Sequence, residues 1–319
     1  MLSNLLYSIN VILPIILLVL FGVILKRFGK LGDSFCETAD WLVFKVGLPV
    51  MLFNEIIGCN FEKEFDAKMI AFIVISVTSA FVAVSLLAVA FIKDKAKRGA
   101  FVQGMCRSNF AILGVPLAVN MFGEAGGQAI AIATPFVILM FNAYSVILLS
   151  IFAGNDRHKL DLRTVLGILK NVVTNPLIIA VVLGLPFVFF HITLPTAATK
   201  TLSYLAGLAT PLALLSLGAN FKRENLKGRL GYSLVASIGK TVILPFIMVT
   251  IAVLVGLRGP ALGVVLICFG SPTAVSSYIM AKKMDNDYDL AGQILLISTV
   301  LCSVTIFIFT FILKNLALI

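Results

Sequence analysis

The stretch Arg107-Ser-Asn-Phe-Ala-Ile-Leu-Gly-Val-Pro-Leu-Ala-Val119 lies in an apolar run in the first half of the chain, and Gly270-Ser-Pro-Thr-Ala-Val-Ser-Ser277 lies in another in the second half. Each contains a proline, Pro116 or Pro272, followed two residues later by Ala-Val. A proline inside a helix removes a backbone donor and clashes with the preceding turn. In a bilayer, the carbonyl groups freed in this way need partners from protein or from a cavity. The two stretches therefore predict two broken membrane helices.

The sequence around these stretches is too apolar for a soluble domain. Hydrophobic residues make up 60% of the 319 residues and charged residues 13%, and the mean hydropathy is +1.07. A helix needs roughly 20 apolar residues to cross a bilayer. Ten runs approach or exceed this length: 5–25, 41–57, 69–92, 99–121, 127–153, 172–190, 201–219, 230–257, 260–281 and 290–313. Because these runs do not alternate as membrane β-strands do, the sequence predicts an all-α membrane protein with ten transmembrane helices.

The two halves of the chain resemble each other at three corresponding places. Similar segments open at Pro49 and Pro211 and end in Gly-x-Asn-Phe, the two broken stretches match, and Gly-Gln pairs stand at Gly127 and Gly292. The offsets are 162, 156 and 165 residues. A unit of five helices crosses the membrane an odd number of times, so its second copy must be inverted. We expect a first repeat over 1–153, a cytoplasmic linker over 154–164 and a second repeat over 165–319.

The basic residues are distributed between the apolar runs rather than gathered on one soluble face, which argues against a nucleic-acid partner. Alternate loops hold 17 of the 25 Lys and Arg residues, and the opposite loops hold five. Because basic residues concentrate in cytoplasmic loops, we expect a multi-pass protein of the cell membrane with both termini on the non-cytoplasmic side.

The two breaks indicate a binding site for an anion. Half-helices starting near Pro116 and Pro272 would present free N–H groups and positive dipole ends at the bilayer midplane, where an anion binds favourably. Amide and hydroxyl groups and two glycines accompany the prolines. We expect the substrate-binding residues to be Asn109, Gly114, Pro116, Gly270, Ser271, Pro272, Thr273, Ser276 and Ser277. The alternative is that the prolines and glycines only kink the helices.

Four charged residues inside the runs are candidates for charge compensation or ion coupling, because ionisable groups at this depth usually face a cavity or a partner. These residues are Arg107, Lys240, Lys45 and Glu55. Arg107 could instead extend toward the cytoplasmic surface. Glu55 lies near the end of its run and is the only acid that we assign to a span. Asn54 either lines the cavity or caps a helix end.

Sequence motifs for other classes of protein are absent. The chain has no Gly-rich phosphate loop, no zinc-binding His-Glu-x-x-His and no evident nucleophile with its base. The five cysteines lack metal-ligand spacing. We therefore expect neither an enzyme nor an ATP-driven pump, and no metal or cofactor.

Several of these residues together resemble the auxin efflux carrier family, which includes bacterial malonate and other organic-acid permeases and the PIN-type auxin carriers of plants. The resemblance covers the whole chain. The matching residues are Leu48-Pro49, Asn109, Gly114-Val-Pro116, Asn175-Pro176, Pro211-Leu-Ala-Leu, Gly218 and Pro272-Thr-Ala.

The resemblance implies the ten-helix fold of bile-acid sodium symporters, in which broken helices four and nine cross. It implies that helices one, two, six and seven form a scaffold, that the other six form a moving transport domain, and that the scaffold forms a homodimer. It also implies that the crossover prolines flank a substrate carboxylate, with Asn109 as the crossover asparagine. The segment 154–164 is much shorter than the cytoplasmic loop of plant carriers, which argues against auxin itself and against plant-type phosphoregulation.

The sequence therefore predicts an alternating-access carrier for a small organic anion, malonate-like or auxin-like. It leaves open the particular acid and whether protons or sodium are coupled. One alternative is a cation/proton antiporter, although such proteins generally need carboxylates inside the membrane. Another alternative is a membrane sensor that does not transport.

Overall fold

The structure is a computed structural model that describes residues 2–58, 66–153, 166, 170, 173–221 and 228–319. Within these residues the regular secondary structure is entirely helical. The first half contains α1 (Leu2–Arg27), α2 (Asp33–Leu42), the π-helical turn η1 (Val43–Gly47), α3 (Leu48–Ile57), α4 (Ala67–Phe91), α5 (Lys95–Cys106) and α6 (Phe110–Ile151). The second half contains α8 (Pro176–Phe189), α9 (Thr196–Gly207), α10 (Ala209–Ala219), α11 (Leu230–Ile238), the π-helical turn η3 (Gly239–Ile243), α12 (Leu244–Leu254), α13 (Gly259–Gly270), α14 (Ser276–Lys283) and α15 (Tyr288–Asn315).

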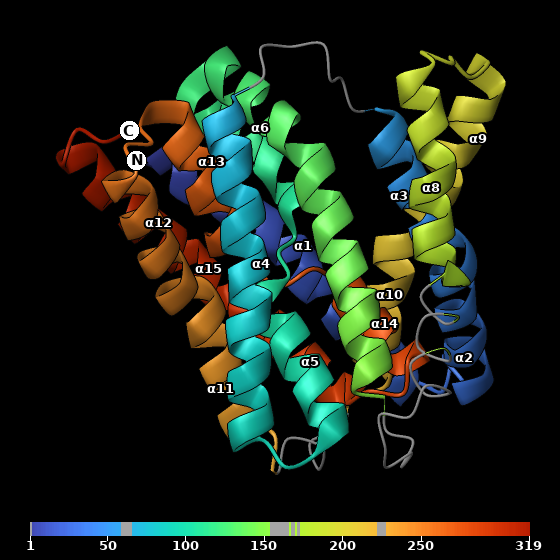
Figure 1. Cartoon of the computed structure of the whole chain (residues 1–319). Helices are drawn as coiled ribbons and strands as arrows, with labels where there is room; N and C mark the ends of the chain where they lie inside the picture. The colour runs from blue at the N-terminus through green and yellow to red at the C-terminus, as the bar shows by residue number, and fades with distance from the viewer. Residues whose placement is uncertain (1, 59–65, 154–165, 167–169, 171–172, 222–227) are drawn as a thin grey trace.

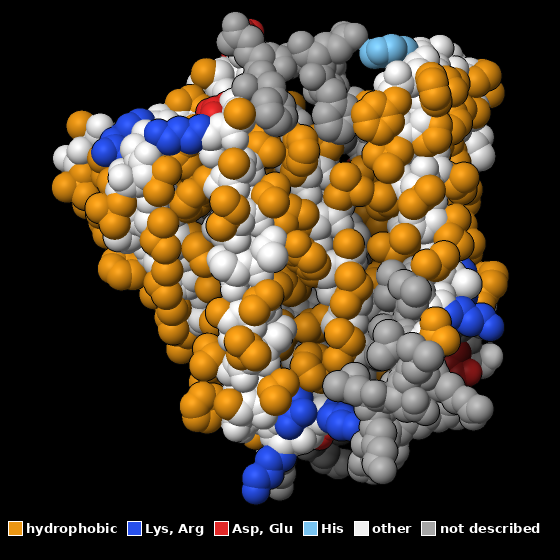
Figure 2. Space-filling model, in the orientation of Figure 1, with side chains coloured by type: hydrophobic (Ala, Val, Ile, Leu, Met, Phe, Trp, Pro, Cys, Tyr) orange, Lys and Arg blue, Asp and Glu red, His pale blue; other side chains and the backbone are white. Residues whose placement is uncertain are grey.

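The bundle has the surface of a protein surrounded by lipid. Five described segments are long and apolar enough to cross a membrane: Ala67–Phe91, Leu117–Ile151, Thr196–Ala219, Leu230–Leu254 and Tyr288–Asn315. Apolar side chains cover the sides of the molecule, and most of the visible Lys and Arg side chains lie toward its ends (Figure 2). Large apolar side chains such as Leu86 and Leu254 are exposed on these sides. Since lipid tails would cover such residues, these features identify a multi-pass helical membrane protein.

Two π-helical turns precede Leu-Pro pairs. In the first, η1 joins α2 to α3 just before Pro49, so that one helical stretch runs from Asp33 to Ile57. In the second, η3 joins α11 to α12 just before Pro245. Proline cannot donate to the helical ladder, and a π-helical turn changes the hydrogen-bonding register locally. The first of these stretches therefore begins eight residues before the span predicted over 41–57.

A sharp kink at Gly123 divides α6 into two helices. Gly123 has φ 64° and ψ −141°, a conformation open only to glycine, and the chain is helical on both sides of it. The kink lies between the spans predicted over 99–121 and 127–153. The division into two spans stays a prediction, and the only break in the helix between them is this one residue.

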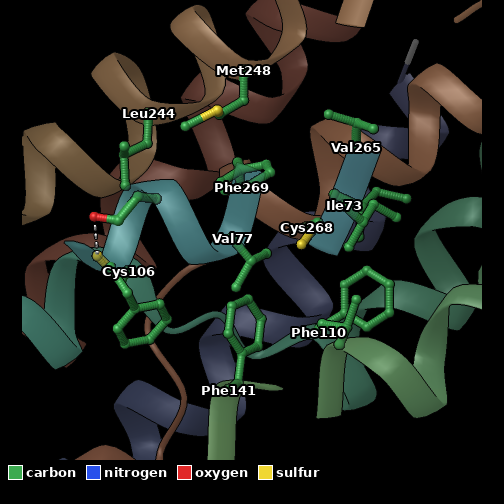
Figure 3. Packing of buried hydrophobic residues seen from close by; sticks show 14 of the residues in the cluster. Ile73, Val77, Cys106, Phe110, Phe141, Leu244, Met248, Val265, Cys268 and Phe269 are labelled. Atoms are coloured by element: carbon green, nitrogen blue, oxygen red, sulfur yellow. Dashed lines mark hydrogen bonds between the residues drawn. The ribbon is translucent and has the colours of Figure 1, made fainter. Parts of the chain in front are cut away.

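Buried apolar residues form two large clusters. The larger one joins α4, α5, α6, α12, α13 and α15. Figure 3 shows part of it, where Val77 of α4 lies beside Phe141 of α6, and Phe269 of α13 lies below Met248 of α12. The second cluster joins α1, η1, α3, α8 and α10, and it also takes in residues of α6, α14 and α15. In Figure 1, α3, α8 and α9 stand apart from α4, α12 and α13 on opposite sides of the molecule.

The close packing of α1 against α10 depends on glycine. A Cβ at Gly218 would lie 2.0 Å from the carbonyl oxygen of Val19, and one at Gly22 would lie 2.4 Å from that of Leu215. Small residues allow two helix backbones to approach closely in this way. Gly58, which matches Gly218 in the repeat predicted from the sequence, instead caps the C-terminus of α3.

Candidate functional site

The first break lies at Arg107–Asn109, between α5 and α6, and not at Pro116. Helix α5 ends at Cys106, and α6 begins at Phe110 with Asn109 at its N-cap position. Ser and Asn side chains compete with helical hydrogen bonds and favour such positions, so the break forms before the proline. Pro116 lies inside α6, and the prediction that the half-helix begins near it is wrong.

The second break covers residues 271–275, between α13 and α14. Pro272 lies in this break, and Ser271 before it is extended, with φ −65° and ψ 150°, as the residue before a proline usually is. The following half-helix begins at Ser276, four residues later than predicted.

The two breaks contact each other through hydrogen bonds. The backbone N–H of Asn109 donates to the carbonyl of Pro272 at 2.8 Å, and the hydroxyl of Ser108 donates to the carbonyl of Ser271 at 3.4 Å. The hydroxyl of Thr273 donates to the carbonyl of Gly104, in the last turn of α5. Each break therefore satisfies backbone groups that the other leaves without helical partners.

The Arg107 side chain points into the protein. It is 5% exposed; its Nη2 donates to Asn142 Oδ1 at 2.9 Å and to Ser276 Oγ at 2.8 Å, and its Nη1 donates to Met280 Sδ at 2.7 Å. The alternative that Arg107 extends to the membrane surface is therefore wrong. Arg107 joins the first break to α6 and to the first turn of α14.

Glu55, Arg107 and Asn109 line a small cavity beside the breaks. Asn142 and Ser276 also line it, and its volume is about 40 Å³, which is enough to hold water. Helices α6 and α14 both begin at this cavity. Their N-terminal N–H groups and the guanidinium attract negative charge, and Glu55 of α3 interacts electrostatically with Arg107 across it.

Lys240 lies behind the breaks rather than in this cavity. Its side chain has no exposed surface, and its ammonium donates to the carbonyl of Cys106, the last residue of α5, at 3.4 Å. A cation is favourable at a helix C-terminus. Lys240 therefore supplies positive charge to the end of α5.

The remaining predicted residues divide between packing and surface positions. Gly114 and Gly270 pack against apolar side chains, because a Cβ at Gly114 would lie 2.7 Å from Ile130 Cδ1 and one at Gly270 would lie 3.5 Å from Ile306 and Leu266. Lys45 is exposed in η1 and does not line the cavity.

Three predicted hydrogen-bonding side chains have unsatisfied oxygens. Within the described residues, the hydroxyls of Ser271 and Ser277 are buried without hydrogen-bond partners, and so is the Oδ1 of Asn54. None of these three residues lines the cavity.

Asn142 and Asp40 were not predicted from the sequence. Asn142 could have been found from its amide side chain, which lies in the centre of an apolar run. Asp40 has no exposed surface and lies 2.5 Å from the Nζ of Lys282, which also lies over the rings of Tyr278 and Tyr288. Asp40 therefore adds an acid with no exposed surface to the helical stretch that contains Glu55. Elsewhere in the described residues, no group of three or more His, Cys, Asp or Glu side chains could hold a metal ion.

An apolar helical bundle with paired helix breaks beside a buried charged cavity defines a membrane transporter. The family model described as membrane transport protein matches residues 7–310. The chain therefore belongs to that family, the auxin efflux carrier family, and the resemblance seen in the sequence is confirmed.

Three relatives illustrate the range of the family. The chain is 27% identical to an uncharacterised transporter of Methanothermobacter thermautotrophicus, over 94% of this chain and 96% of the relative. It is 24% identical to a putative malonate transporter of Rhizobium meliloti, over 93% of each. It is 28% identical to a probable auxin efflux carrier component 3b of Oryza sativa, over 43% of this chain and 23% of the relative.

Proposed function

We propose that the protein carries a small organic anion, a mono- or dicarboxylate, across the cell membrane by alternating access. The observation that supports this most directly is the convergence of the Arg107 guanidinium and the N-termini of α6 and α14 on one buried cavity. Guanidinium groups and helix N-termini both bind carboxylates well. The name of the Rhizobium relative makes malonate a suitable first substrate to test.

Within this proposal, Arg107 pairs with the substrate carboxylate, and Asn109 and Ser276 hydrogen-bond to it. All three line the cavity. Thr273, Gly114 and Gly270 position the two breaks through the contacts described above. Pro116 lies in the half-helix that follows the first break, and Pro272 lies in the second break itself.

The division of the buried apolar residues supports a carrier with two bodies. We assign α1, α2, α3, α8, α9 and α10 to a scaffold and α4–α6 with α11–α15 to a transport domain, which agrees with the two main clusters. Residues of α6, α14 and α15 in the second cluster would form the sliding interface. We also propose that the chain crosses the membrane ten times as two inverted repeats, with both termini outside the cytoplasm. The scaffold forms a homodimer.

The cation/proton antiporter is the less favourable alternative. It requires a buried carboxylate that exchanges cations, and the candidates near the breaks and the charged end of α14 are Glu55 and Asp40. Asp40 is paired with Lys282, and Glu55 interacts with Arg107. Cationic partners at both carboxylates disfavour a second cation by like-charge repulsion.

Uptake by proteoliposomes tests the proposed function. Wild-type protein should accumulate labelled malonate or another acid from a carboxylate panel, and Asn109→Ala should reduce the initial rate at least about tenfold, the effect of roughly 1.4 kcal/mol in transition-state energy. Asn120→Ala is the matched control, because Asn120 is exposed on α6. Equal rates for wild type and Asn109→Ala would contradict the site assignment. Sodium-dependent proton movement without an organic acid would instead support an antiporter.

A further inference from the structure

The charges that line the cavity balance each other before any substrate enters. Arg107 and Glu55 are the two charged residues that line it among the described residues, and they attract each other. The elements packed against α3 add no third charge: α8 carries no ionisable side chain, while Lys45 of η1, Lys200 of α9 and Glu124 of α6 are exposed. Tyr204 of α9 is also exposed, and Tyr144 of α6 forms a hydrogen bond with Thr78.

Arg107 retains a donor for one further group. Its Nη1 and Nη2 atoms have the partners described above, but its Nε is buried without a hydrogen-bond partner among the described residues. A guanidinium binds a carboxylate through such N–H groups. Glu55 lines the same cavity, however, so a substrate carboxylate that reaches this donor lies beside the carboxylate of Glu55.

A substrate carboxylate would therefore meet another negative charge at close range. Two carboxylates that share one buried site do not both stay ionised without a high cost, and Arg107 neutralises only one of them. Glu55 belongs to the proposed scaffold and Arg107 to the proposed transport domain, so their interaction also joins the two bodies.

Building on the proposed function, we infer that Glu55 occupies the anion position of the empty carrier and takes up one proton from solvent when a substrate carboxylate replaces it at Arg107. The proton binds a carboxylate oxygen of Glu55, and no covalent bond of the substrate changes. Each bound carboxylate is thereby accompanied by one proton, which makes the carrier a proton symporter. Neutral Glu55 no longer attracts Arg107, so the contact between the two bodies is released in the same step.

Calorimetry of malonate binding by the purified full-length protein tests this inference. Titrations in buffers with different ionisation enthalpies count the protons taken up per malonate, and at pH near neutrality malonate itself stays ionised. Wild type should take up one proton, and its affinity should fall about tenfold per pH unit above neutrality, as linkage requires for one proton. Glu55→Gln should bind malonate with no proton uptake and with an affinity independent of pH.

Two controls keep the result specific to Glu55. Glu37→Gln makes the same chemical change at an exposed position of α2 and should behave as wild type. Glu55→Asp retains a carboxylate and should still take up a proton, so its proton count also separates titration from a general defect in folding.

The contrary outcomes are distinguishable. Malonate binding by wild type without proton uptake, or one proton taken up by Glu55→Gln, would overturn the role of Glu55 and leave the carboxylate carrier intact. If wild type and Glu37→Gln both failed to bind malonate and every other acid of the panel, the proposed function would fail first, and the inference with it.

Discussion

Lys240 illustrates at the scale of one residue how a buried charge can serve function at the expense of stability. Its side chain has no exposed surface, and its one hydrogen bond in the described residues, to the Cys106 carbonyl, is long at 3.4 Å. Desolvation of such a group usually costs more than one contact returns. Ionisable residues retained inside membrane segments are commonly functional. We therefore expect the charge of Lys240 to serve transport.

Replacing Lys240 with methionine tests this interpretation. Lys240→Met keeps most of the side-chain volume and removes the charge. We therefore predict a melting temperature a few degrees above that of wild type, which corresponds to a free energy of unfolding higher by roughly 1 kcal/mol. We also predict slower uptake. Lys200→Met, at an exposed position of α9, is the matched control. A large fall in the melting temperature of Lys240→Met would show that the ammonium is a structural cap for α5.

The residues of the candidate site differ in how well the sequence predicted them. Arg107 and Asn109 were predictable, because polar side chains inside an apolar run need partners. Asn142 is 35 residues from Arg107, and its contact with Arg107 follows from the way α6 folds back past the break. Asp40 was missed because the apolar run was taken to begin at Trp41, whereas the helix begins at Asp33.

At the scale of elements, the boundaries depend on local backbone chemistry. The sequence located both broken stretches, but it placed the half-helix starts at prolines. In the structure, Asn109 precedes α6, and the residues between Pro272 and Ser276 lie outside the helices, so that α14 begins only at Ser276. The local preference of Ser-Asn for a helix end outweighed the signal from Pro116, and hydrogen bonds between the breaks stabilise the result.

Gly123 provides a prediction at this scale. An alanine there would be strained, because φ 64° with ψ −141° is accessible almost only to glycine. We predict that Gly123→Ala lowers stability by about 1–3 kcal/mol, measured as a fall in melting temperature. Gly207→Ala is the control, because a Cβ at Gly207 meets nothing within 4 Å. Unchanged stability of Gly123→Ala would mean that the kink takes another conformation.

At the scale of the whole molecule, the ion pair between Asp40 and Lys282 joins α2 to the end of α14. Asp40 has no exposed surface, whereas the side chain of Lys282 is 17% exposed. The pair therefore connects the proposed scaffold to the proposed transport domain at a second place, separate from the Glu55–Arg107 interaction.

The different exposure of the two partners predicts unequal costs. Lys282→Met leaves a fully buried carboxylate unpaired and should lower the free energy of unfolding by roughly 3–5 kcal/mol. Asp40→Asn should lower it less, because the Lys282 ammonium can reach water. Asp40→Asn with Lys282→Met should recover most of the loss. Melting temperatures of the three variants in detergent provide the measurement. Equal losses for the single variants, with additive loss in the double variant, would contradict a coupled buried pair.

The architecture of the whole molecule could be predicted only in part. Hydropathy indicated an all-helical membrane protein, because long apolar runs have few other folds available. The division of the buried side chains into two main clusters depends on contacts between distant segments, such as Gly218 against Val19, and apolar periodicity alone does not specify such contacts.

The central claim is that Arg107 binds the carboxylate of a transported anion, and charge movement on a solid-supported membrane tests it most directly. Wild-type proteoliposomes should give a current on addition of at least one dicarboxylate of the panel, because a dianion carried with one proton still moves net charge, and the size of the current should depend on pH. Arg107→Gln should abolish the current, while Arg27→Gln, at the exposed last residue of α1, should preserve it. A carboxylate-dependent current of equal size in wild type and Arg107→Gln would contradict the account.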